Sequence, residues 1–499
     1  MIRRNSVGRK RARVWPVAVA ALAMAAGVAA CEPRSTPSPS ASSAEQSGIH
    51  KIKHVIVIMQ ENRSFDSYFG MYPGADGIPM VGGIPIACVP YPPKGACVRP
   101  FVTHADVDAE GPHGAPDAAA DIDSGLMDGF IAQAVRAAKN CNDVVNPSCA
   151  QASVIDVMGY HVGSDIPNYW AYARNYVLQD HMFEPNASWS LPEHLFMVSE
   201  WSAACTQHNN PESCVNALNT PGNPPDFPTG SSHAPPVYAW TDLTYVLHQH
   251  GVSWGYFVVS GHEPDCENDS ALSCAPVNQN SATPGIWNPL PYFDTVANDG
   301  ELGNIRPVSD FYAAAKTGKL PAVSWVVPSA EVSEHAPYPV SFGQSYVTSL
   351  VNAVMRGPDW NTSAIFVSWD DWGGRYDHVP PPSVDENGYG IRVPGLVISP
   401  YARHGHIDHQ ILSFDAYDKF IEDVFLGGQR LDPTTDGRPD PRVTIREDVH
   451  ILGNLASDFD FSQAPRARML LPVFPNTTLT GTPAPGAAPL AAIVGRFDR

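Results

Sequence analysis

Two pairs of oxygen-bearing side chains follow directly after apolar runs that are far apart in the sequence. Residues 52–59, mostly Ile and Val, lead through Gln60 into Glu61 and Asn62, and residues 364–369 lead into Asp370 and Asp371. Such runs are typical of strands buried on both faces of a parallel sheet, and their carboxyl ends meet at the ligand-binding edge of α/β folds. Divalent cations prefer carboxylate and amide oxygens, so these residues predict a metal site. The alternative is that Glu61 and Asn62 only cap the segment after the strand.

A nucleophile is predicted in residues 186–194, which read Asn-Ala-Ser-Trp-Ser-Leu-Pro-Glu-His. Ser188 and Ser190 each carry a hydroxyl shortly before Pro192, which would fix the following turn. A hydroxyl is a weak nucleophile until a base or a cation lowers its pKa, so a serine beside a divalent metal is a plausible attacking group. Either serine is a candidate, and the alternative is a loop serine that caps a helix beginning near Leu195.

Two histidines lie in contexts that suggest a role at the same site. His113 lies in a Gly-Pro-His-Gly segment among acidic residues, and His335 follows the apolar run 322–327. His335 therefore follows a predicted strand end, as the metal-ligand candidates do. Any single histidine among the 18 in this chain is more often structural than catalytic.

The order of the remaining patterns indicates one large α/β fold that positions these residues. Further predicted strands cover residues 252–259, 322–327 and 393–398, and helical patterns cover 129–139, 165–176, 241–250, 308–316, 341–355 and 414–424. Strands that alternate with helices predict a mostly parallel sheet between two helical layers. Residues 204–237 and 259–290 look like long irregular excursions, and the sequence is Pro-rich and irregular after about residue 445.

The first residues of the chain predict export and lipid anchoring. Six basic side chains precede an alanine-rich apolar stretch that ends at Ala30, and Val28-Ala-Ala-Cys31 resembles a bacterial lipobox, in which Cys31 becomes the lipidated first residue. An ordinary secretory signal with a chance cysteine is the alternative, and Arg3-Arg4 leaves the export route open. We expect a signal over residues 1–30, an anchor and disordered Pro/Ser tether over 31–48, and a single domain over 49–499.

The remaining eight cysteines fall into local pairs, which agrees with an exported protein. The pairs are eight or nine residues apart: Cys88 with Cys97, Cys141 with Cys149, Cys205 with Cys214, and Cys266 with Cys274. Four disulfides that staple loops are the simplest interpretation. Zinc binding is the alternative, but no pair has the two-residue spacing or the flanking histidines of a zinc ribbon.

The charge of the chain restricts its partners. The formal net charge is −20, although the first 30 residues contain only basic charged side chains. A surface this acidic argues against nucleic acid as a partner. An anionic substrate would need a local cation, which a bound metal would supply.

Several motifs together resemble the bacterial phospholipase C and acid phosphatase family of phosphoesterases. They are IKHVIVIMQENRSFDSYFG, the Gly125–Phe130 patch, LPAVSWVVPSAEVSEHAP, WDDWGGRYDHVPPP and GIRVPGLVISPYAR, and they cover most of residues 50–430 in the order of that family. The resemblance implies an alkaline-phosphatase-like, three-layer αβα sandwich with a mostly parallel central sheet, decorated here by disulfide-stapled loops.

The resemblance also implies roles for individual residues. It implies that a single divalent metal, with Ca, Mg, Mn and Fe all open, is held by Glu61, Asn62, Asp370 and Asp371. It places the nucleophile at Ser190, which would form a phosphoserine that water then hydrolyses. His113 and His335 would bind phosphate oxygens or protonate the leaving alcohol, and His378 would lie behind them or face the substrate.

The implied substrate is a phosphate ester, and a phospholipid head group is one possibility. Monoester and diester cleavage use the same metal and nucleophile, so the sequence leaves that choice open. The short C-terminal region and a serine nucleophile are closer to the acid phosphatase pattern than to the phospholipase C pattern.

Two other functions fit parts of the sequence. Ser190-Leu-Pro192-Glu-His194 is similar to the sulfatase signature, but His194 stands where that signature has arginine. A non-catalytic surface lipoprotein with the same fold is the second alternative. The presence of all four oxygen ligands, the hydroxyl and two histidines argues against it.

Overall fold

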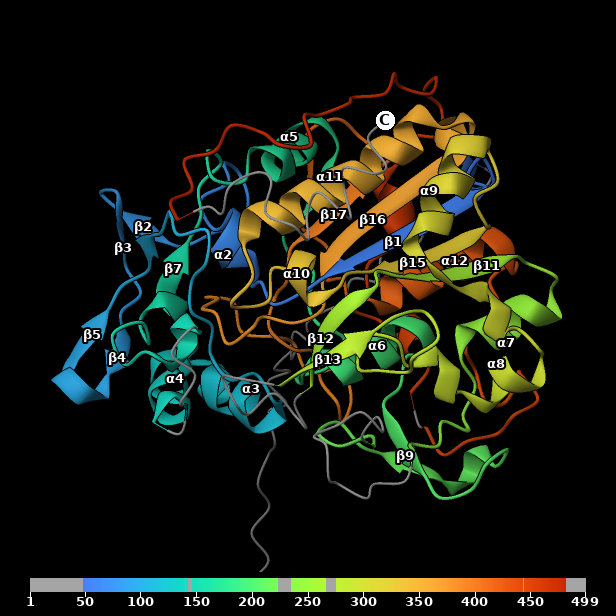
Figure 1. Ribbon diagram of the computed structural model, residues 1–499, viewed down its shortest axis with the longest axis horizontal. Coiled ribbons are helices and arrows are strands. Elements are labelled where there is room, and N and C mark those ends of the chain that lie inside the picture. Colours follow the sequence, from blue (N-terminus) through green and yellow to red (C-terminus); the bar gives the residue numbers. More distant parts are fainter. Residues whose placement is uncertain are drawn as a thin grey trace, which may run out of the picture. The chain divides into compact units, whose positions relative to one another are not determined.

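Strand β1 (His54–Gln60) lies at the centre of an eight-stranded sheet in the computed structural model (Figure 1). The strand order is β14-β11-β15-β1-β16-β17-β8-β18. The other seven strands are β14 (Ile305–Pro307), β11 (Trp254–Val258), β15 (Val323–Val327), β16 (Ser363–Trp369), β17 (Gly395–Ile398), β8 (Val177–Gln179) and β18 (His406–Asp408). Every pairing in this sheet is parallel except the two that β17 makes, with β16 and β8. The predicted mostly parallel sheet is confirmed.

The structure describes residues 48–139, 141, 146–222, 235–265, 275–442 and 444–481. All of them belong to one compact unit, Ser38–Arg499. The predicted signal, the predicted anchor Cys31 and nearly all of the tether lie outside the described residues. No helix in these ranges combines the length and the apolar character that a membrane span requires.

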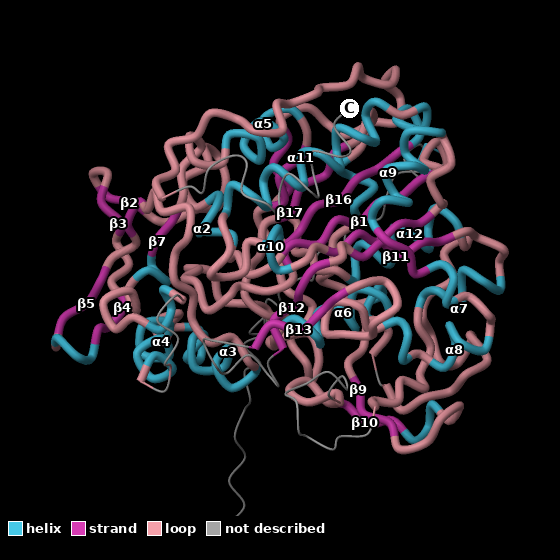
Figure 2. The backbone as a smooth tube through the Cα atoms, viewed as in Figure 1, coloured by secondary structure: helices cyan, strands magenta, loops and turns pink. Residues whose placement is uncertain are grey.

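Eleven α-helices are found in these ranges, and Figure 2 colours the helices cyan among magenta strands and pink loops. They are α2 (Phe65–Phe69), α3 (Ala115–Ile122), α4 (Phe130–Ala138), α5 (Pro167–Asn175), α6 (Ser190–Ser199), α7 (Leu243–Gln249), α8 (Asp294–Asn298), α9 (Val308–Thr317), α10 (Ala330–Ser333), α11 (Val340–Arg356) and α12 (Asp415–Phe425). The six helical patterns of the sequence correspond to α4, α5, α7, α9, α11 and α12.

The alternation of side chains along the strands places helices on both faces of the sheet. Phe366 of β16 stacks on Tyr417 of α12, with ring centroids 5.0 Å apart. Through β1 and β15, Phe366 is in register with Tyr256 of β11, so both point to one face. The next residue, Phe257, points to the opposite face and packs against Phe311 of α9, with ring centroids 5.4 Å apart.

The other large helices extend these two layers. Helices α5 and α11 pack together, and α11 also packs against α9, whereas α6 packs against both α7 and α12. Figure 1 shows α5, α9 and α11 together and α6, α7 and α12 apart from them. The molecule is therefore a three-layer αβα sandwich, as the sequence predicted.

The long connections contain small two-stranded sheets. These are β2 (Met80–Val81) with β3 (Ile84–Pro85), β4 (Val89–Tyr91) with β5 (Ala96–Val98), β6 (Phe101–Val102) with β7 (Gly159–Tyr160), β9 (Ala203–Cys205) with β10 (Cys214–Asn216), and β12 (Gly261–Asp265) with β13 (Ala275–Gln279). Disulfides join Cys88 to Cys97, Cys141 to Cys149 and Cys205 to Cys214, as predicted. The predicted pair Cys266 and Cys274 lies outside the described residues.

A second apolar cluster anchors the excursion that contains His113. Side chains of α3, α4 and β4 pack with Trp372 and Tyr376, which belong to the loop after β16. Phe130 of α4 meets Tyr376 edge-on, with ring centroids 5.4 Å apart. The excursion therefore packs directly on the loop that carries the predicted aspartate ligands.

Strands β8, β14 and β18 of the main sheet were not predicted, and two further differences from the sequence predictions have a clear physical reason. Helix α6 begins at Ser190 and not near Leu195, because Trp189 is extended at the N-cap and Pro192 is tolerated in a first helical turn. Strand β17 is antiparallel to its neighbours. A fully buried apolar strand has the same composition in either direction, so its sequence could not reveal the direction.

Candidate active site

The four predicted metal ligands meet at the carboxyl ends of β1 and β16. Gln60 and Trp369, the last residues of these strands, are in register, and the Asp370 amide donates to the Gln60 carbonyl at 2.8 Å. The backbone N–H of Asn62 donates a hydrogen bond to Asp370 Oδ1 at 3.2 Å. The sheet therefore brings Glu61, Asn62, Asp370 and Asp371 together, and all four are buried.

Ser190 contacts two of these residues. Its Oγ lies 3.1 Å from Glu61 Oε2 and 3.3 Å from Asp371 Oδ2. The other candidate, Ser188, donates instead to the Leu218 carbonyl at 2.8 Å. Of the two serines, Ser190 is therefore the one whose hydroxyl contacts the predicted ligands, and it does so from the first residue of α6.

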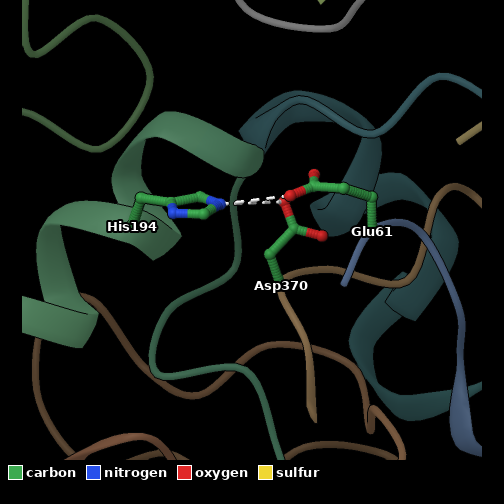
Figure 3. Close-up of side chains that lie close together, drawn as sticks. All are labelled: Glu61, His194 and Asp370. Atoms are coloured by element: carbon green, nitrogen blue, oxygen red, sulfur yellow. Dashed lines mark hydrogen bonds and ion pairs between the residues drawn. The ribbon is translucent and has the colours of Figure 1, made fainter. Parts of the chain in front are cut away.

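His194 lies one helical turn after Ser190 and also reaches these ligands. Its Nε2 is 3.1 Å from Glu61 Oε1 and 3.9 Å from Asp370 Oδ2. Figure 3 shows the imidazole pointing from α6 toward both carboxylates. Burial lowers the pKa of His194 to about 4, although Asp370 acts in the opposite direction. The imidazole is therefore neutral at pH 7.

Asn62 adopts a strained backbone conformation that suits a ligand-binding turn. Its φ is 59°, in the left-handed region that Asn tolerates better than most residues. Its Nδ2 donates to Glu110 Oε2 at 3.0 Å, which fixes the orientation of the amide. Gly373 packs against this turn, and a Cβ there would lie 2.7 Å from the Asn62 Cβ. A side chain at position 373 would therefore displace Asn62.

The donor atoms at this point fit a divalent cation. Asn62 Oδ1 and Asp370 Oδ2 are buried and have no hydrogen-bond partner among the described residues. Burial, and then Asp370 and Asp371, raise the pKa of Glu61 well above its ordinary value. Several carboxylates so close together repel one another, and a cation would remove that repulsion. Glu61, Asn62, Asp370 and Asp371 can thus hold the ion that the sequence predicted.

His113 and His335 lie next to this group and are joined to it through Glu110. Their rings are 5.8 Å apart, and His335 Nδ1 is 3.1 Å from Glu110 Oε1. Asn62 Nδ2 lies 3.4 Å from His113 Nε2. The His335 Nε2 atom is buried without a hydrogen-bond partner in the described part of the chain, so it is available to a ligand.

His378 belongs to a different cluster. Its Nδ1 lies 2.8 Å from Asp66 Oδ2 and its Nε2 lies 3.4 Å from Asp76 Oδ1. Arg392 pairs with Asp66 and Asp377 in the same cluster. The structure thus gathers seven of the eight predicted site residues and places His378 among these other charges.

Sequence reasoning missed four buried side chains near the site: His194, Glu110, Glu184 and Glu193. Burial, followed by the charges of Asp371 and Asp370, raises the pKa of Glu184 well above its ordinary value. Burial, followed by the charges of Glu184 and Asp371, raises the pKa of Glu193 in the same way. A helical spacing of four residues from Ser190 could have identified His194. Glu110 and Glu184 lie in loops, where the sequence contains no periodic signal.

The sequence and fold of this chain are similar to those of known proteins. Residues 52–426 match the Phosphoesterase family. Phospholipase C B of Mycobacterium tuberculosis (strain ATCC 25618 / H37Rv) is 25% identical over 461 residues, which cover 83% of this chain and 78% of the relative. Non-hemolytic phospholipase C of Burkholderia pseudomallei (strain K96243) is 25% identical over 474 residues, which cover 83% of this chain and 60% of the relative. Among solved structures, the PsFucS1 sulfatase of Pseudoalteromonas sp. aligns over 85% of this chain and 77% of its own, with a TM-score of 0.34 and 10% identity.

Proposed function

Because the chain belongs to the Phosphoesterase family and is a phosphoric ester hydrolase, we propose that Ser190 is its nucleophile and that Glu61, Asn62, Asp370 and Asp371 hold one divalent metal. The observation that carries this proposal is the position of the Ser190 hydroxyl, 3.1 Å from Glu61 Oε2 and 3.3 Å from Asp371 Oδ2. A hydroxyl between two carboxylates from separate strand ends is placed to lose its proton and to attack phosphorus.

The metal, when bound, would lower the pKa of the Ser190 hydroxyl and offset negative charge on a phosphoryl oxygen. Ser190 attacks phosphorus in line with the leaving alcohol, and a phosphoserine forms as the P–O bond to that alcohol breaks. Ser190 is the first residue of α6, which has no side-chain cap. The positive end of the helix dipole adds about 0.3–1 kcal/mol of stabilisation for negative charge there.

We assign the proton transfer to the two histidines. His335 Nε2 has no partner in the described residues and donates a proton to the leaving alcohol. His113 lies beside Asn62 and binds a phosphoryl oxygen. A water molecule then attacks the phosphoserine and gives a proton back to His335, and the Ser190 oxygen regains the proton it lost in the first step as its bond to phosphorus breaks. His378 would act only indirectly, through the Asp66 cluster.

We propose a phosphodiester with a phospholipid-type head group as the substrate. The support is that both relatives above are named phospholipase C. The sulfatase alternative is not favoured, because the matching family consists of phosphoesterases. The binding-protein alternative is not favoured either, since the nucleophile and the ligand set occur together.

The test compares p-nitrophenyl phosphorylcholine, p-nitrophenyl phosphate and p-nitrophenyl sulfate as substrates, with and without a chelator. Activity on the diester should disappear in Ser190→Ala and on chelation, and should return with added metal. Ser188→Ala is the matched control, because its hydroxyl contacts only the Leu218 carbonyl in the described structure. Hydrolysis of the monoester alone would make the protein a phosphatase, and unchanged activity in Ser190→Ala would refute the nucleophile.

We also propose that the protein is exported and attached to a membrane by a lipid at Cys31. The support is the basic and apolar leader with its lipobox-like end. A lipid anchor attaches a protein to a membrane without a spanning helix. The active site would then face the cell exterior.

A further inference from the structure

Helix α6 presents two groups to the same carboxylate. Ser190 and His194 are four residues apart and therefore lie on one face of the helix. Glu61 Oε2 is 3.1 Å from Ser190 Oγ, and Glu61 Oε1 is 3.1 Å from His194 Nε2. One glutamate thus contacts the proposed nucleophile with one oxygen and the imidazole with the other.

Tyr256 offers an acceptor to the second ring nitrogen of His194. The Tyr256 hydroxyl donates its only proton to the Trp287 carbonyl at 2.7 Å. Toward His194 Nδ1, which is 3.5 Å away, the Tyr256 oxygen can therefore only accept a proton. Metal-binding histidines are usually oriented in this way, with the second ring nitrogen donating to a neighbour. When the proton is on Nδ1, the Nε2 lone pair points at Glu61 and Asp370.

In this arrangement, a cation between the Nε2 lone pair and the two carboxylate oxygens would remove the repulsion among these atoms. Donor atoms of Glu61, His194 and Asp370 all lie within 4.8 Å of one another. Nitrogen and oxygen ligands bind divalent metals at about 2.0–2.2 Å, so two ligands of one ion lie about 3–4 Å apart. The 3.1 Å and 3.9 Å separations of His194 Nε2 from the two carboxylates match this requirement.

We infer that His194 Nε2 is a direct ligand of the metal, which makes the site a mixed nitrogen and oxygen site. This inference rests on the proposed function, since it concerns the same ion. Imidazole suits transition metals, whereas Ca²⁺ and Mg²⁺ prefer sites built from oxygen alone. The nitrogen ligand therefore favours a transition metal such as Fe²⁺ or Zn²⁺ over Ca²⁺ and Mg²⁺.

The test measures the ligands of bound Mn²⁺ and does not depend on activity. The full-length protein is freed of metal with a chelator, loaded with one equivalent of Mn²⁺ in imidazole-free buffer, and studied by pulsed electron paramagnetic resonance. We expect nitrogen-14 coupling from one directly bound imidazole. The coupling should be lost in His194→Gln.

Two control variants exclude other histidines. His406→Gln changes a separate group, with Asp408 and Asp458, that could also hold a cation. His113→Gln changes the ring beside Asn62. Both variants should retain the nitrogen coupling. In competition experiments His194→Gln should lower the affinity for Zn²⁺ at least about 10-fold relative to the affinity for Ca²⁺.

The outcomes separate this inference from the proposed function. Bound Mn²⁺ without nitrogen coupling in the wild type would overturn the inference, even if Ser190-dependent hydrolysis is intact. Coupling that persists in His194→Gln would also overturn it. A protein that binds no Mn²⁺ would overturn both the metal centre and the inference. Because the wild-type spectrum alone can decide, a misfolded variant does not leave the question open.

Discussion

At the scale of single residues, the site concentrates buried negative charge that the fold alone does not neutralise. Asp370 Oδ1 accepts hydrogen bonds from the backbone amides of Asn62 and Asp371, while Asp370 Oδ2 has no hydrogen-bond partner in the described residues. Glu61 lies close to Asp370 and Asp371, so the repulsion among these carboxylates destabilises the metal-free site further. Binding sites commonly sacrifice stability in this way for function.

We predict that Asp370→Asn makes the metal-free protein more stable and the enzyme inactive. Removing one of the crowded charges should raise the free energy of unfolding without metal by about 1 kcal/mol. Loss of a charged metal ligand should lower kcat/KM at least about 100-fold. Thermal unfolding with and without metal, together with diester hydrolysis, measures both effects.

The matched control is Asp310→Asn, which makes the same chemical change at an exposed position of α9. Asp310→Asn should change the free energy of unfolding by less than about 0.5 kcal/mol and leave kcat/KM for the diester unchanged. An Asp370→Asn variant that is less stable without metal, or that retains full activity, would contradict the account of this site.

At the scale of elements, two buried arginines hold the turn after β1 in place by hydrogen bonds. Arg63 Nη1 and Arg375 Nε donate to the Asn62 carbonyl at 2.9 Å and 3.2 Å. Arg375 in turn donates two hydrogen bonds to Asp108, at 3.0 Å and 2.9 Å, and all of these side chains are buried. Asp108 thus links the His113 excursion to the turn that carries two predicted metal ligands.

We predict that Asp108→Asn destabilises the protein by about 3–5 kcal/mol at pH 7, because it removes the carboxylate that pairs with the buried guanidinium groups of Arg375 and Arg63. Burial alone would raise the pKa of Asp108, but Arg375 and Arg63 hold it well below its ordinary value. A carboxyl pKa that is lower in the folded state contributes stability above the unfolded value of about 3.9, and this contribution is lost as the pH falls below it.

The stability difference between wild type and Asp108→Asn should therefore shrink below about pH 4. Near neutral pH the difference should increase as the pH falls, because Asp108 helps to raise the pKa of His161. Urea unfolding at several pH values measures this difference. A difference that does not shrink below about pH 4 would show that the charge of Asp108 does not stabilise the fold.

At the scale of the whole molecule, we propose that residues 49–499 act as a single domain. The family match ends at residue 426, but the later segment packs on the same fold. Phe459 stacks on Phe420 of α12 with ring centroids 5.2 Å apart, and Ala402 forms a β-bridge with Phe459. Three disulfides hold the long excursions that surround this core.

We predict that Cys31→Ala releases the whole protein from the membrane fraction into the medium, because its attachment would depend on the lipid at that residue. Fractionation of cells that express each form, followed by the diester assay on each fraction, checks this. Cys88→Ala is a suitable comparison, since it removes a disulfide cysteine and leaves the lipidation site intact. A Cys31→Ala protein that stays in the membrane fraction would contradict the anchor.

The sequence alone determined the chemistry of the strand ends and the class of the fold. Continuous apolar runs identified β1, β15 and β16, because a strand that is covered on both faces has no polar side. The residues that follow these runs had to lie at one edge, since parallel strands end together. Local cysteine spacing also predicted three disulfides that the structure contains.

Only the tertiary structure decided which side chains meet across long sequence distances. The family resemblance had already implied Ser190, and the structure adds that the Ser190 hydroxyl, and not that of Ser188, contacts Glu61 and Asp371, because α6 docks beside the end of β1. It added His194 and Glu110 to the site and placed His378 in another cluster. It also set the direction of β17. Sequence periodicity records which face of an element is buried, but the partner of that face depends on packing between distant segments.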